Sequence, residues 1–557
     1  MDGQLPSAQT LVDLPSVIRI SQLPLPIDHA DDALLHAVRK RLRLPQLPAE
    51  AIAIFQRAID AREGKPLVFS YTIDVTLEDS VEEAILERSS KHQRPPLVRK
   101  RPDTDYHFPQ EHRASRPPSD RPLVIGTGPS GLFAGLLLAQ LGLCPILLER
   151  GKMAGPRARD VTKFWRTGEF DPESNVQFGE GGAGTFSDGK LYTQIKDRGN
   201  HCRKVLQELA AHGAPEDILV NSRPHIGTDK LITVLRNLRE TITELGGEIR
   251  YESKVTDLHI EDGRIHGVTL ADGTSLNAKH VVLAIGHSAR DMFELLATKP
   301  LVLEPKPFSV GVRIEHPQSL INKTQYGRYA GHERLGSAAY RFVHHGRQRR
   351  SVYSFCMCPG GQVIGASSEP GRLVSNGMST YARADANANS GFMVEVHPKD
   401  IPGAGKDPLA GIQFQRDLEE RAFQLGGSNY HAPVQLLGDF MKDRASVGVG
   451  SIEPSFRPGV TYTDLRECLP AFISKALKEA VPRIAKRLKG FDHSHAILTA
   501  VESRSSSPLR ITRNKDCQCL NVQGLYPAGE GAGYAGGIVS AAVDGLRVAE
   551  SLAADMA

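Results

Sequence analysis

Three glycines close to residue 128 have the spacing of a turn that holds a dinucleotide. Gly126, Gly128 and Gly131 follow a short apolar run and open a second apolar stretch. In such a turn the first glycine allows the tight bend, the second lets the backbone approach a pyrophosphate, and the third allows a helix to pack closely on a strand. A helix that starts at Pro129 and Ser130 directs its free backbone N–H groups at the phosphates. The pattern therefore predicts a dinucleotide site.

A carboxylate stands where such a site needs one. Glu149 ends the next apolar run, about 20 residues after the glycine turn, at the position from which an acid accepts the hydroxyls of the adenosine ribose. An acid at this position repels a 2′-phosphate. The site therefore favours FAD or NAD over NADP.

Glycine also gathers between residues 175 and 191, where Gly182 and Gly184 stand beside Thr185 and Ser187. So many glycines beside hydroxyl side chains suit a backbone that wraps a flat ring and donates N–H groups to it. A flexible loop is the alternative for this stretch.

A further glycine-rich stretch, residues 524–538, resembles the motif with which FAD enzymes return to their flavin. The resemblance implies that Gly529 and Glu530 lie near the ribityl chain and the pyrophosphate, and that Gly537 and Ile538 lie at the isoalloxazine ring. A helix that begins near Ile538 would aim its positive end at the flavin N1/C2 carbonyl region, where reduction places negative charge. Such a helix would stabilise the reduced flavin.

The elements between these stretches favour FAD over NAD. A helical face over residues 231–238 is followed by strands that two Asp-Gly pairs separate, and then by a buried run at 280–286. FAD-dependent oxidoreductases have a segment that looks like this, a β-meander that returns to the sheet. By that resemblance Val255 lies beside the adenine and Gly286 passes near the cofactor.

Together these motifs resemble a bacterial family of uncharacterised FAD-dependent dehydrogenases, in which a small ferredoxin-like N-terminal domain precedes an FAD fold. The matching phrases are residues 175–193, 307–317, 355–361, 376–379 and 457–460 and the C-terminal glycine motif. The resemblance implies an α/β chain with a glutathione-reductase-like FAD-binding Rossmann fold, an inserted α+β substrate domain and non-covalently bound FAD. It also assigns Arg150 and Arg157 to the cofactor. No second complete nucleotide fold is visible, so NAD(P)H, if it donates electrons, would bind transiently in the substrate cleft.

The pattern along the chain predicts five segments. A β-α-β-β order with a further helix indicates a ferredoxin-like unit at the start, and a segment dense in Pro and Arg indicates an extended linker after it. The segments are residues 1–90 (ferredoxin-like), 91–120 (linker), 121–300 (first part of the FAD-binding domain), 301–500 (substrate domain) and 501–557 (last part of the FAD-binding domain).

In such enzymes the flavin carries the redox chemistry, and protein groups orient a substrate and move protons. Cys356 and Cys358 are the most suggestive pair on the substrate side. On a strand, residues i and i+2 share a face with Cα atoms about 6.5–7 Å apart, at the upper edge of disulfide geometry. A flavin-linked dithiol and a pair of small packing residues both remain open.

Glu502 and Arg504 are the second pair of substrate-side candidates. They could line the cavity and bind an anionic substrate, with Glu502 pairing Arg504, or they could form a purely structural ion pair. Arg510 belongs with this pair as a residue that could line the cavity and bind an anionic substrate, and weaker candidates are Asn376, Tyr381 and Arg383.

Composition bounds the class of protein. The chain has 557 residues, of which 40% are hydrophobic, with 68 Lys and Arg against 64 Asp and Glu. These values exclude a collagen-like, wholly disordered or disulfide-stapled chain. Seven cysteines are too sparse for a disulfide framework, and we expect a reducing cytoplasm. Two C-x-C pairs lack the spacing of a four-cysteine metal site, so no metal is expected.

The longest apolar run, residues 132–148, is interrupted by polar residues, glycines and a proline, and it is shorter than the ~20 residues that a membrane span needs. The start of the chain lacks the basic and apolar regions of a secretory signal. We therefore expect neither a membrane span nor secretion.

Three functions compete. The leading hypothesis is an FAD-dependent oxidoreductase that oxidises or reduces a small organic molecule. A flavin-dependent enzyme that modifies RNA bases is an alternative, motivated by the small first domain, the basic linker and the basic cluster at residues 344–350. A non-catalytic flavin-binding scaffold is the third. The sequence does not disclose the oligomeric state.

Overall fold

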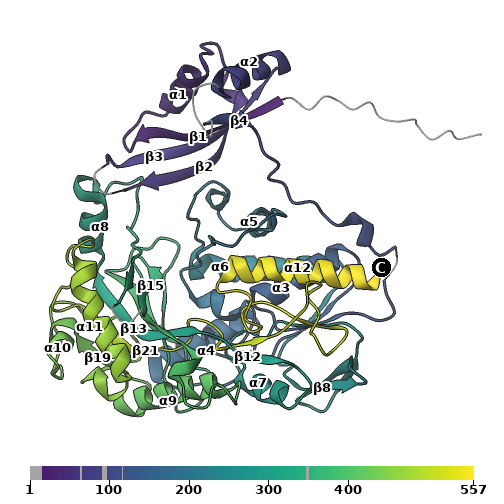
Figure 1. Ribbon diagram of the computed structural model, residues 1–557, viewed down its shortest axis with the longest axis vertical. Coiled ribbons are helices and arrows are strands. Elements are labelled where there is room, and N and C mark those ends of the chain that lie inside the picture. Colours follow the sequence, from purple (N-terminus) through teal and green to yellow (C-terminus); the bar gives the residue numbers. More distant parts are fainter. Residues whose placement is uncertain (1–15, 63–64, 91–96, 116, 347–349) are drawn as a thin grey trace, which may run out of the picture. The chain divides into compact units, whose positions relative to one another are not determined.

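The protein falls into two compact units (Figure 1). The computed structural model describes residues 16–62, 65–90, 97–115, 117–346 and 350–557. The first unit takes in the chain up to Asp105 together with Leu219–Arg223. The second unit takes in Tyr106–Ile218 and Pro224–Ala557.

The first unit is an antiparallel sheet with two helices. Its elements are β1 (Ser16–Pro26), α1 (Ala33–Leu42), η1 (Ala49–Ala51), β2 (Ile52–Asp60), β3 (Val68–Leu77), α2 (Asp79–Ser90) and β4 (Val98–Lys100). The strand order in the sheet is β2-β3-β1-β4. Tyr71, Ile73 and Val75 of β3 are buried in alternation with less buried polar residues, because successive side chains of a strand point to opposite faces. Figure 1 shows α1 and α2 on the same side of this sheet.

The predicted linker of residues 91–120 is wrong at residues 98–100, which belong to the sheet of the first unit. Val98–Lys100 form β4, in which Val98 pairs with Ile20 and Lys100 with Ile18. A composition rich in Pro and Arg predicts an extended tether, but it does not reveal that the edge of β1 offers backbone hydrogen-bond partners. Val98 is buried in this pairing.

The later part of the predicted linker is anchored within the second unit. The hydroxyl of Tyr106 donates a 2.6 Å hydrogen bond to Glu550. Residues 91–96 of the linker and residues 63–64 of the predicted hairpin turn lie outside the described residues.

The second unit contains a five-stranded parallel sheet of strand order β23-β11-β5-β6-β7 and a three-stranded antiparallel sheet of order β10-β9-β8. Its elements are β5 (Leu123–Ile125), α3 (Pro129–Gln140), β6 (Ile146–Leu148), α4 (Ala154–Thr167), η3 (Gly182–Phe186), α5 (His201–Ala211), α6 (Gly227–Glu244), β7 (Glu248–Arg250), β8 (Val255–Glu261), β9 (Arg264–Leu270), β10 (Ser275–Asn277), β11 (Val281–Leu283), α7 (Arg290–Ala297), β23 (Leu525–Pro527) and α12 (Ile538–Met556). The predicted order of strand, glycine turn, helix and strand at residues 122–148 is confirmed.

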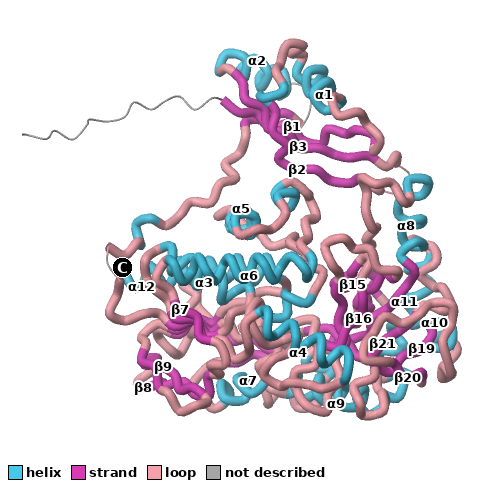
Figure 2. The backbone as a smooth tube through the Cα atoms, turned by 180° about the vertical axis from the view of Figure 1, so that it is seen from behind, coloured by secondary structure: helices cyan, strands magenta, loops and turns pink. Residues whose placement is uncertain are grey.

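Helix α3 is buried at every position from Ser130 to Ala139, as its apolar sequence all round requires. It packs against α12 from the end of the chain and against α6 (Figures 1 and 2). The parallel sheet and these helices therefore bring the first and last parts of the unit together.

The middle of the second unit is built on a seven-stranded sheet of order β14-β15-β18-β13-β21-β19-β20. Its elements are β12 (Leu303–Pro305), β13 (Phe308–Pro317), α8 (Gln318–Tyr326), η5 (Gly327–Tyr329), β14 (Val343–His345), β15 (Ser351–Cys358), β16 (Gln362–Gly365), β17 (Ser375–Met378), β18 (Asn387–Val396), η6 (Pro398–Asp400), α9 (Ala410–Leu425), β19 (Ala432–Leu436), α10 (Leu437–Met441), β20 (Val460–Tyr462), η7 (Leu465–Glu467), α11 (Ala471–Ala485), β21 (Ile497–Glu502) and β22 (Leu509–Ile511). Strand β13 is buried from Phe308 to His316, which fits its central place between β18 and β21.

No helix among the described residues combines the length and the apolar character that crossing a bilayer requires.

Candidate functional site

The second unit contains a cavity of about 360 Å³ at the carboxyl ends of its parallel strands. Strands β5, β6, β11 and β23 each place a residue at or just after their ends in its lining, namely Ile125, Leu148, Ala284 and Ala528. Ligands of open parallel sheets bind at this edge, where the glycine-rich turns and the helix N-termini converge. The fold therefore collects the predicted motifs around one space.

The first glycine turn has the predicted geometry. Gly126 has φ = 100°, in the region that L side chains rarely adopt, and a Cβ on Gly131 would lie 1.9 Å from the carbonyl oxygen of Gly126. A Cβ on Gly182 would lie 3.0 Å from the Cα of Gly128. Side chains at Gly131 and Gly182 would therefore collide with neighbouring backbone, so this close packing requires glycine at both positions.

Ser130 lines the cavity, and its hydroxyl is buried without a hydrogen-bond partner among the described residues. Leaving a buried hydroxyl unpaired costs about 1–3 kcal/mol. This atom at the start of α3 therefore suits an acceptor on a bound ligand, such as a phosphate oxygen.

Glu149 also lines the cavity. Its Oε2 accepts from the backbone N–H of Thr127 at 2.9 Å and from the Thr127 hydroxyl at 2.7 Å. Its Oε1 accepts from the N–H groups of Gly151 and Gly179, both at 2.9 Å. The carboxylate thus ties the glycine turn to the end of β6 and to the glycine-rich loop at residues 175–187.

Arg157 does not line the cavity, which corrects its predicted contact with a cofactor. Its guanidinium is fully buried and donates to five backbone carbonyls of the 175–187 loop, those of Asn175, Val176, Gly179, Glu180 and Gly182. Burial lowers the pKa of Arg157 to about 10, while the charges of Glu149 and Glu180 oppose the shift. Arg157 therefore fixes the backbone of this loop on the side away from the cavity.

Thr185 is corrected in the same way. Its hydroxyl donates to the carbonyl of Glu180 at 3.1 Å and accepts from Arg157 at 3.3 Å. The side chain is buried inside the loop and does not line the cavity.

Two residues that were not predicted, Asp544 and Arg513, support the C-terminal glycine motif. Asp544 of α12 accepts from the backbone N–H of Gly529 at 2.7 Å and from Arg513 at 2.5 and 2.9 Å. Gly529 itself does not line the cavity, whereas Glu530 and the start of α12 do. Helix α12 is 19 residues long, and the positive end of its dipole lies at the N-terminus, which lines this space.

Most residues predicted for the cofactor line the cavity. They are Gly126, Gly128, Pro129, Ser130, Glu149, Arg150, Gly182, Ser187, Val255, Gly286, Glu530, Gly537 and Ile538. Gly131, Arg157, Thr185 and Gly529 lie behind the lining. We define the glycine wall as Gly126, Gly128, Gly182, Gly286 and Gly537, and the polar wall as Lys190, Cys356, Asn376, Arg504 and Glu530, all of which line the cavity.

A β-bulge shapes the polar wall. The pairing of β15 with β18 shifts register between Phe355 and Cys358, and Cys356 has φ = 41°. A non-glycine residue in this region is uncommon and strained. Bulges of this kind re-aim side chains next to active sites. Here Cys356 enters the cavity lining and Cys358 is buried behind it.

Cations surround the thiol of Cys356. The hydrogen bond from Cys358, with the charges of Lys190 and Arg313, outweighs burial and lowers the pKa of Cys356 to about 5. Lys190 donates to the carbonyl of Met357 and lies 2.8 Å from Asp188. Lys190 was not predicted, although it belongs to the glycine-rich stretch at residues 175–191.

Glu502 does not pair with Arg504, contrary to the prediction. Its Oε2 lies 2.9 Å from Nε of Arg313 in β13, because β21 runs beside β13 and places Glu502 opposite Gly311. Burial raises the pKa of Glu502 to about 8 even though Arg313 opposes the shift. Arg313 also donates to the carbonyl of Cys356 at 2.8 Å and to Asn376 at 2.9 Å.

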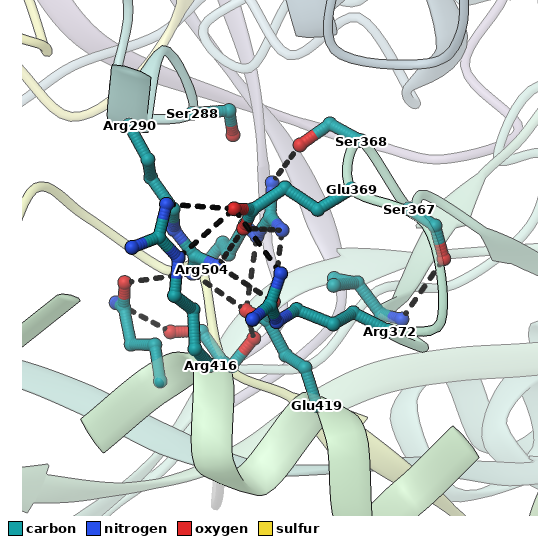
Figure 3. A network of polar contacts seen from close by, with 12 residues as sticks. Ser288, Arg290, Ser367, Ser368, Glu369, Arg372, Arg416, Glu419 and Arg504 are labelled. Atoms are coloured by element: carbon teal, nitrogen blue, oxygen red, sulfur yellow. Dashed lines mark hydrogen bonds and ion pairs between the residues drawn. The ribbon is translucent and has the colours of Figure 1, made fainter. Parts of the chain in front are cut away.

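Arg504 belongs instead to a buried network of arginines and carboxylates, which Figure 3 shows gathered around Glu369 and Glu419. Arg504 donates to Glu419 at 2.8 and 3.0 Å. Arg290 donates to Glu419 at 2.7 Å and to Glu369 at 2.5 Å. Although burial raises the pKa of Glu419, the two arginines outweigh it and hold the carboxyl ionised. The partners were hidden because α7, α9 and the segment after β21 are far apart in sequence.

Two ionisable groups complete the polar surroundings. Burial raises the pKa of Glu530 to about 8, with Lys306 opposing the shift. Burial is the main cause that lowers the pKa of His287 to about 3, and the charges of Arg504 and Arg290 add to it. At neutral pH the cavity therefore presents a protonated carboxyl and a neutral imidazole.

These features fit FAD. The unpartnered Ser130 hydroxyl, the glycine wall and the N-termini of α3 and α12 suit a pyrophosphate and an extended cofactor. When bound, FAD supplies two-electron transfer.

Three family models match parts of the chain. Residues 307–505 match the model described as "FAD-dependent protein, C-terminal domain-like", and residues 223–307 match "Flavin containing amine oxidoreductase". Residues 17–76 match a domain of unknown function.

An uncharacterised protein of Clostridium beijerinckii is 45% identical over 542 residues, which cover 96% of this chain and 98% of that protein. Protein FixC of Escherichia coli is 29% identical over 206 residues, 36% of this chain and 44% of FixC. Among solved structures, a triple mutant of the flavin-dependent brominase Bmp2 covers 78% of this chain and 80% of its own, at 12% identity and a TM-score of 0.36. That superposition is too loose to support an argument about function.

Proposed function

Because this chain belongs to a family of uncharacterised FAD-dependent oxidoreductases, we propose that its substrate is a small organic molecule with an anionic group, bound at the polar wall beside non-covalent FAD. The observation that carries the proposal is the cavity itself, whose lining combines the glycine wall with two cations, Lys190 and Arg504. The first wall suits a cofactor backbone and the second suits an anion.

The proposed cofactor contacts follow the lining. Gly128 and Ser130 would hold the pyrophosphate, and Glu149 and Val255 would lie at the adenosine end. Gly537 would lie at the ring. The N-terminus of α12 favours negative charge in this region, which supports its role toward a reduced flavin.

The proposed substrate contacts use the polar wall. Lys190 keeps its charge because Asp188 lies 2.8 Å away, and it can hold a carboxylate or a similar group. Glu530, protonated at neutral pH, can donate a proton to a substrate atom. NAD(P)H remains a candidate as a transient electron donor in the same cleft.

The finer assignments of the fold are part of this proposal. The sheet order β4-β1-β3-β2 of the first unit supports a ferredoxin-like domain. The order of the parallel sheet with its meander supports a glutathione-reductase-like FAD fold, with the large mixed sheet as the substrate domain. Seven free cysteines are compatible with the expected reducing cytoplasm.

Two measurements test the proposed function. Purified protein should carry flavin in a 1:1 ratio, released intact by heat denaturation, and an anaerobic panel of small anionic metabolites, with and without NADH or NADPH, should contain one that bleaches its visible absorbance. Protein without flavin absorbance, or flavin that only neutral compounds bleach, would contradict it. The matched variants are Lys190→Gln at the polar wall and Lys152→Gln, which pairs with Asp160 and Asp171 outside the lining. Only the first should raise the concentration of metabolite needed.

A further inference from the structure

The two cysteines of the bulge in β15 have an arrangement that packing alone does not require. A regular strand would hold the Cα atoms of Cys356 and Cys358 about 6.5–7 Å apart with their sulfurs side by side at the limit of bonding. The left-handed Cys356 and the register shift replace this geometry. In this bulge the Cys358 thiol donates to the carbonyl oxygen of Cys356 at 3.2 Å.

The two sulfurs differ in access. Cys356 lines the cavity, whereas Cys358 is fully buried behind it. One thiol can therefore meet a molecule that enters the cavity, whereas the other lies two residues away in the same bulge and is shielded from that molecule. This is the division between an attacking and a resolving cysteine.

The charges around the pair favour a thiolate at the accessible position. Lys190 and Arg313 face Cys356 as cations, and Asp188, Glu502 and Glu530 are the carboxyl groups within electrostatic reach. Asp188 is engaged by Lys190 at 2.8 Å and by Arg383 at 2.6 Å.

The other two carboxyl groups are Glu502, which lies 2.9 Å from Arg313, and Glu530. Burial raises the pKa values of Glu502 and Glu530 to about 8, so both hold protons at neutral pH. Neither then adds a full negative charge beside the sulfur of Cys356, which keeps Lys190 and Arg313 as its neighbouring cations. Thiolates are the nucleophiles of exchange reactions.

We propose that Cys356 and Cys358 form a redox-active dithiol that reduces a disulfide-containing small molecule entering the cavity. The Cys356 thiolate attacks one sulfur of the incoming disulfide, forms a mixed disulfide with it and releases the other sulfur as a thiolate. Cys358 then loses its proton and attacks the Cys356 sulfur. This step forms the Cys356–Cys358 disulfide and releases the second thiolate. Two electrons pass from the pair to the substrate; the proton of Cys358 ends on one released thiolate, and solvent supplies the proton of the other.

The reverse exchange with a small dithiol restores the reduced pair. The proposal goes beyond the proposed function, because this exchange needs no flavin. Its tests therefore read the sulfur atoms, and the flavin content of the same sample is measured separately.

The chain supplies its own control. Cys517 and Cys519 form a second C-x-C pair of the same spacing, in which one thiol is partly exposed and the other buried. Burial raises the pKa values of both, and neither lines the cavity.

The first experiment equilibrates the flavin-containing protein with mixtures of reduced and oxidised dithiothreitol, followed by acid quenching, alkylation and peptide mass spectrometry. Cys356 and Cys358 should convert to an intrachain disulfide with a single midpoint, while Cys517 and Cys519 stay alkylated throughout. If both pairs stay reduced in excess oxidised dithiothreitol, or both oxidise together, the proposal is wrong.

The second experiment measures alkylation by iodoacetamide between pH 6 and 8. The rate at Cys356 should be nearly flat, and the rate at Cys517 should rise about tenfold per pH unit, because only the thiolate reacts. A tenfold rise at both positions would overturn the assignment of Cys356 as the attacking thiol.

The third experiment traps the mixed disulfide. With oxidised glutathione, Cys358→Ser should retain one glutathione on Cys356, whereas the wild type should release it and close its own disulfide. Cys519→Ser is the matched variant and should behave as the wild type. Equal retention by Cys358→Ser and the wild type would show that Cys358 does not resolve the bond.

Discussion

The glycine wall and the polar wall of the cavity are built by different means. The glycine wall presents backbone, and its shape depends on positions where a Cβ would meet another chain segment, as at Gly126 and Gly182. The polar wall presents side chains whose charges depend on partners from other elements, as Lys190 depends on Asp188 and Arg504 on Glu419. The comparison teaches that a cofactor site made of backbone can be predicted from short stretches of sequence. A substrate site made of charges cannot, because the partners of each charge come from distant segments.

The largest expected effect, loss of the cofactor, comes from a glycine that packs behind the glycine wall. In Gly131→Ala the new methyl group would lie 1.9 Å from the carbonyl oxygen of Gly126, so β5 and α3 must separate. We expect loss of bound flavin and a free energy of unfolding lower by about 3 kcal/mol, measured by flavin absorbance and urea denaturation.

Gly155→Ala in α4 is the matched control, because its Cβ meets nothing within 4 Å. Alanine there should leave both quantities unchanged or raise stability by about 0.5 kcal/mol. Equal losses in the two variants would mean that close packing at Gly131 does not define this wall.

The next effect tests the support of the polar wall. Glu419→Gln keeps the shape of the side chain but removes the carboxylate that Arg290 and Arg504 share at 2.7 and 2.8 Å. Two buried arginines then lose their main counter-ion, which costs about 3–5 kcal/mol. Urea denaturation monitored by circular dichroism measures the loss.

Glu294→Gln provides the comparison at the exposed edge of the same network. Glu294 pairs with Arg416 at 2.5 Å, but its side chain is 49% exposed, and exposed pairs contribute about 0–1 kcal/mol. A loss at Glu419 no larger than that at Glu294 would contradict the view that the buried network supports Arg504.

The same difference between backbone and side-chain charges decides how much of the site could be predicted from the sequence. The glycine spacing predicted β5, α3 and β6 and most of the glycine wall, because the φ of Gly126 and the close contact of Gly131 allow few other residues. Arg157 was misplaced because its partners are carbonyl groups, which every sequence has and none reveals.

The polar wall was predicted only as residue types. Glu502 was paired with its neighbour in sequence, but β21 runs beside β13 and gives it Arg313. The regular-strand argument at Cys356 and Cys358 failed because nothing in the sequence signalled the bulge of β15. Which strands lie side by side, and where a bulge forms, depends on how all the strands of the sheet pair, so a short stretch of sequence does not reveal it.

A smaller effect uses pH to sharpen the comparison. The pKa of Glu530 rises from 4.5 to about 8 on folding because of burial, so the folded state binds a proton more tightly than the unfolded state. Its contribution to stability is complete below pH 4.5 and is lost as pH rises to about 8. Glu530→Gln should therefore flatten the fall of stability between pH 5 and 7 by up to about 1 kcal/mol per pH unit, measured by urea denaturation at several pH values.

Asp291→Asn is the counterpart with the opposite shift. Although burial acts to raise it, hydrogen bonds and charge from Arg150 and Lys254 lower the pKa of Asp291 to about 2. Its contribution is present above about pH 4 and is lost only in stronger acid. The variant should shift stability by a constant amount between pH 5 and 7. A change of slope in Asp291→Asn and none in Glu530→Gln would reverse this assignment.

The smallest expected effect concerns one charge at the polar wall. Lys190→Gln removes a cation that lowers the pKa of Cys356, while Asp188 keeps Arg383 at 2.6 Å. The pKa of Cys356 should rise by about one unit, equivalent to about 1.4 kcal/mol, and its alkylation rate should begin to rise with pH between 6 and 7.

Lys152→Gln separates this local effect from a general change in charge. Lys152 pairs with Asp160 at 2.8 Å and does not line the cavity, so its loss should leave the alkylation profile of Cys356 flat. If both lysine variants gave a flat profile, Arg313 and Cys358 alone would hold the thiolate. The polar wall would then act on Cys356 through strands β13 and β15, and the loop that carries Lys190 would serve the substrate only.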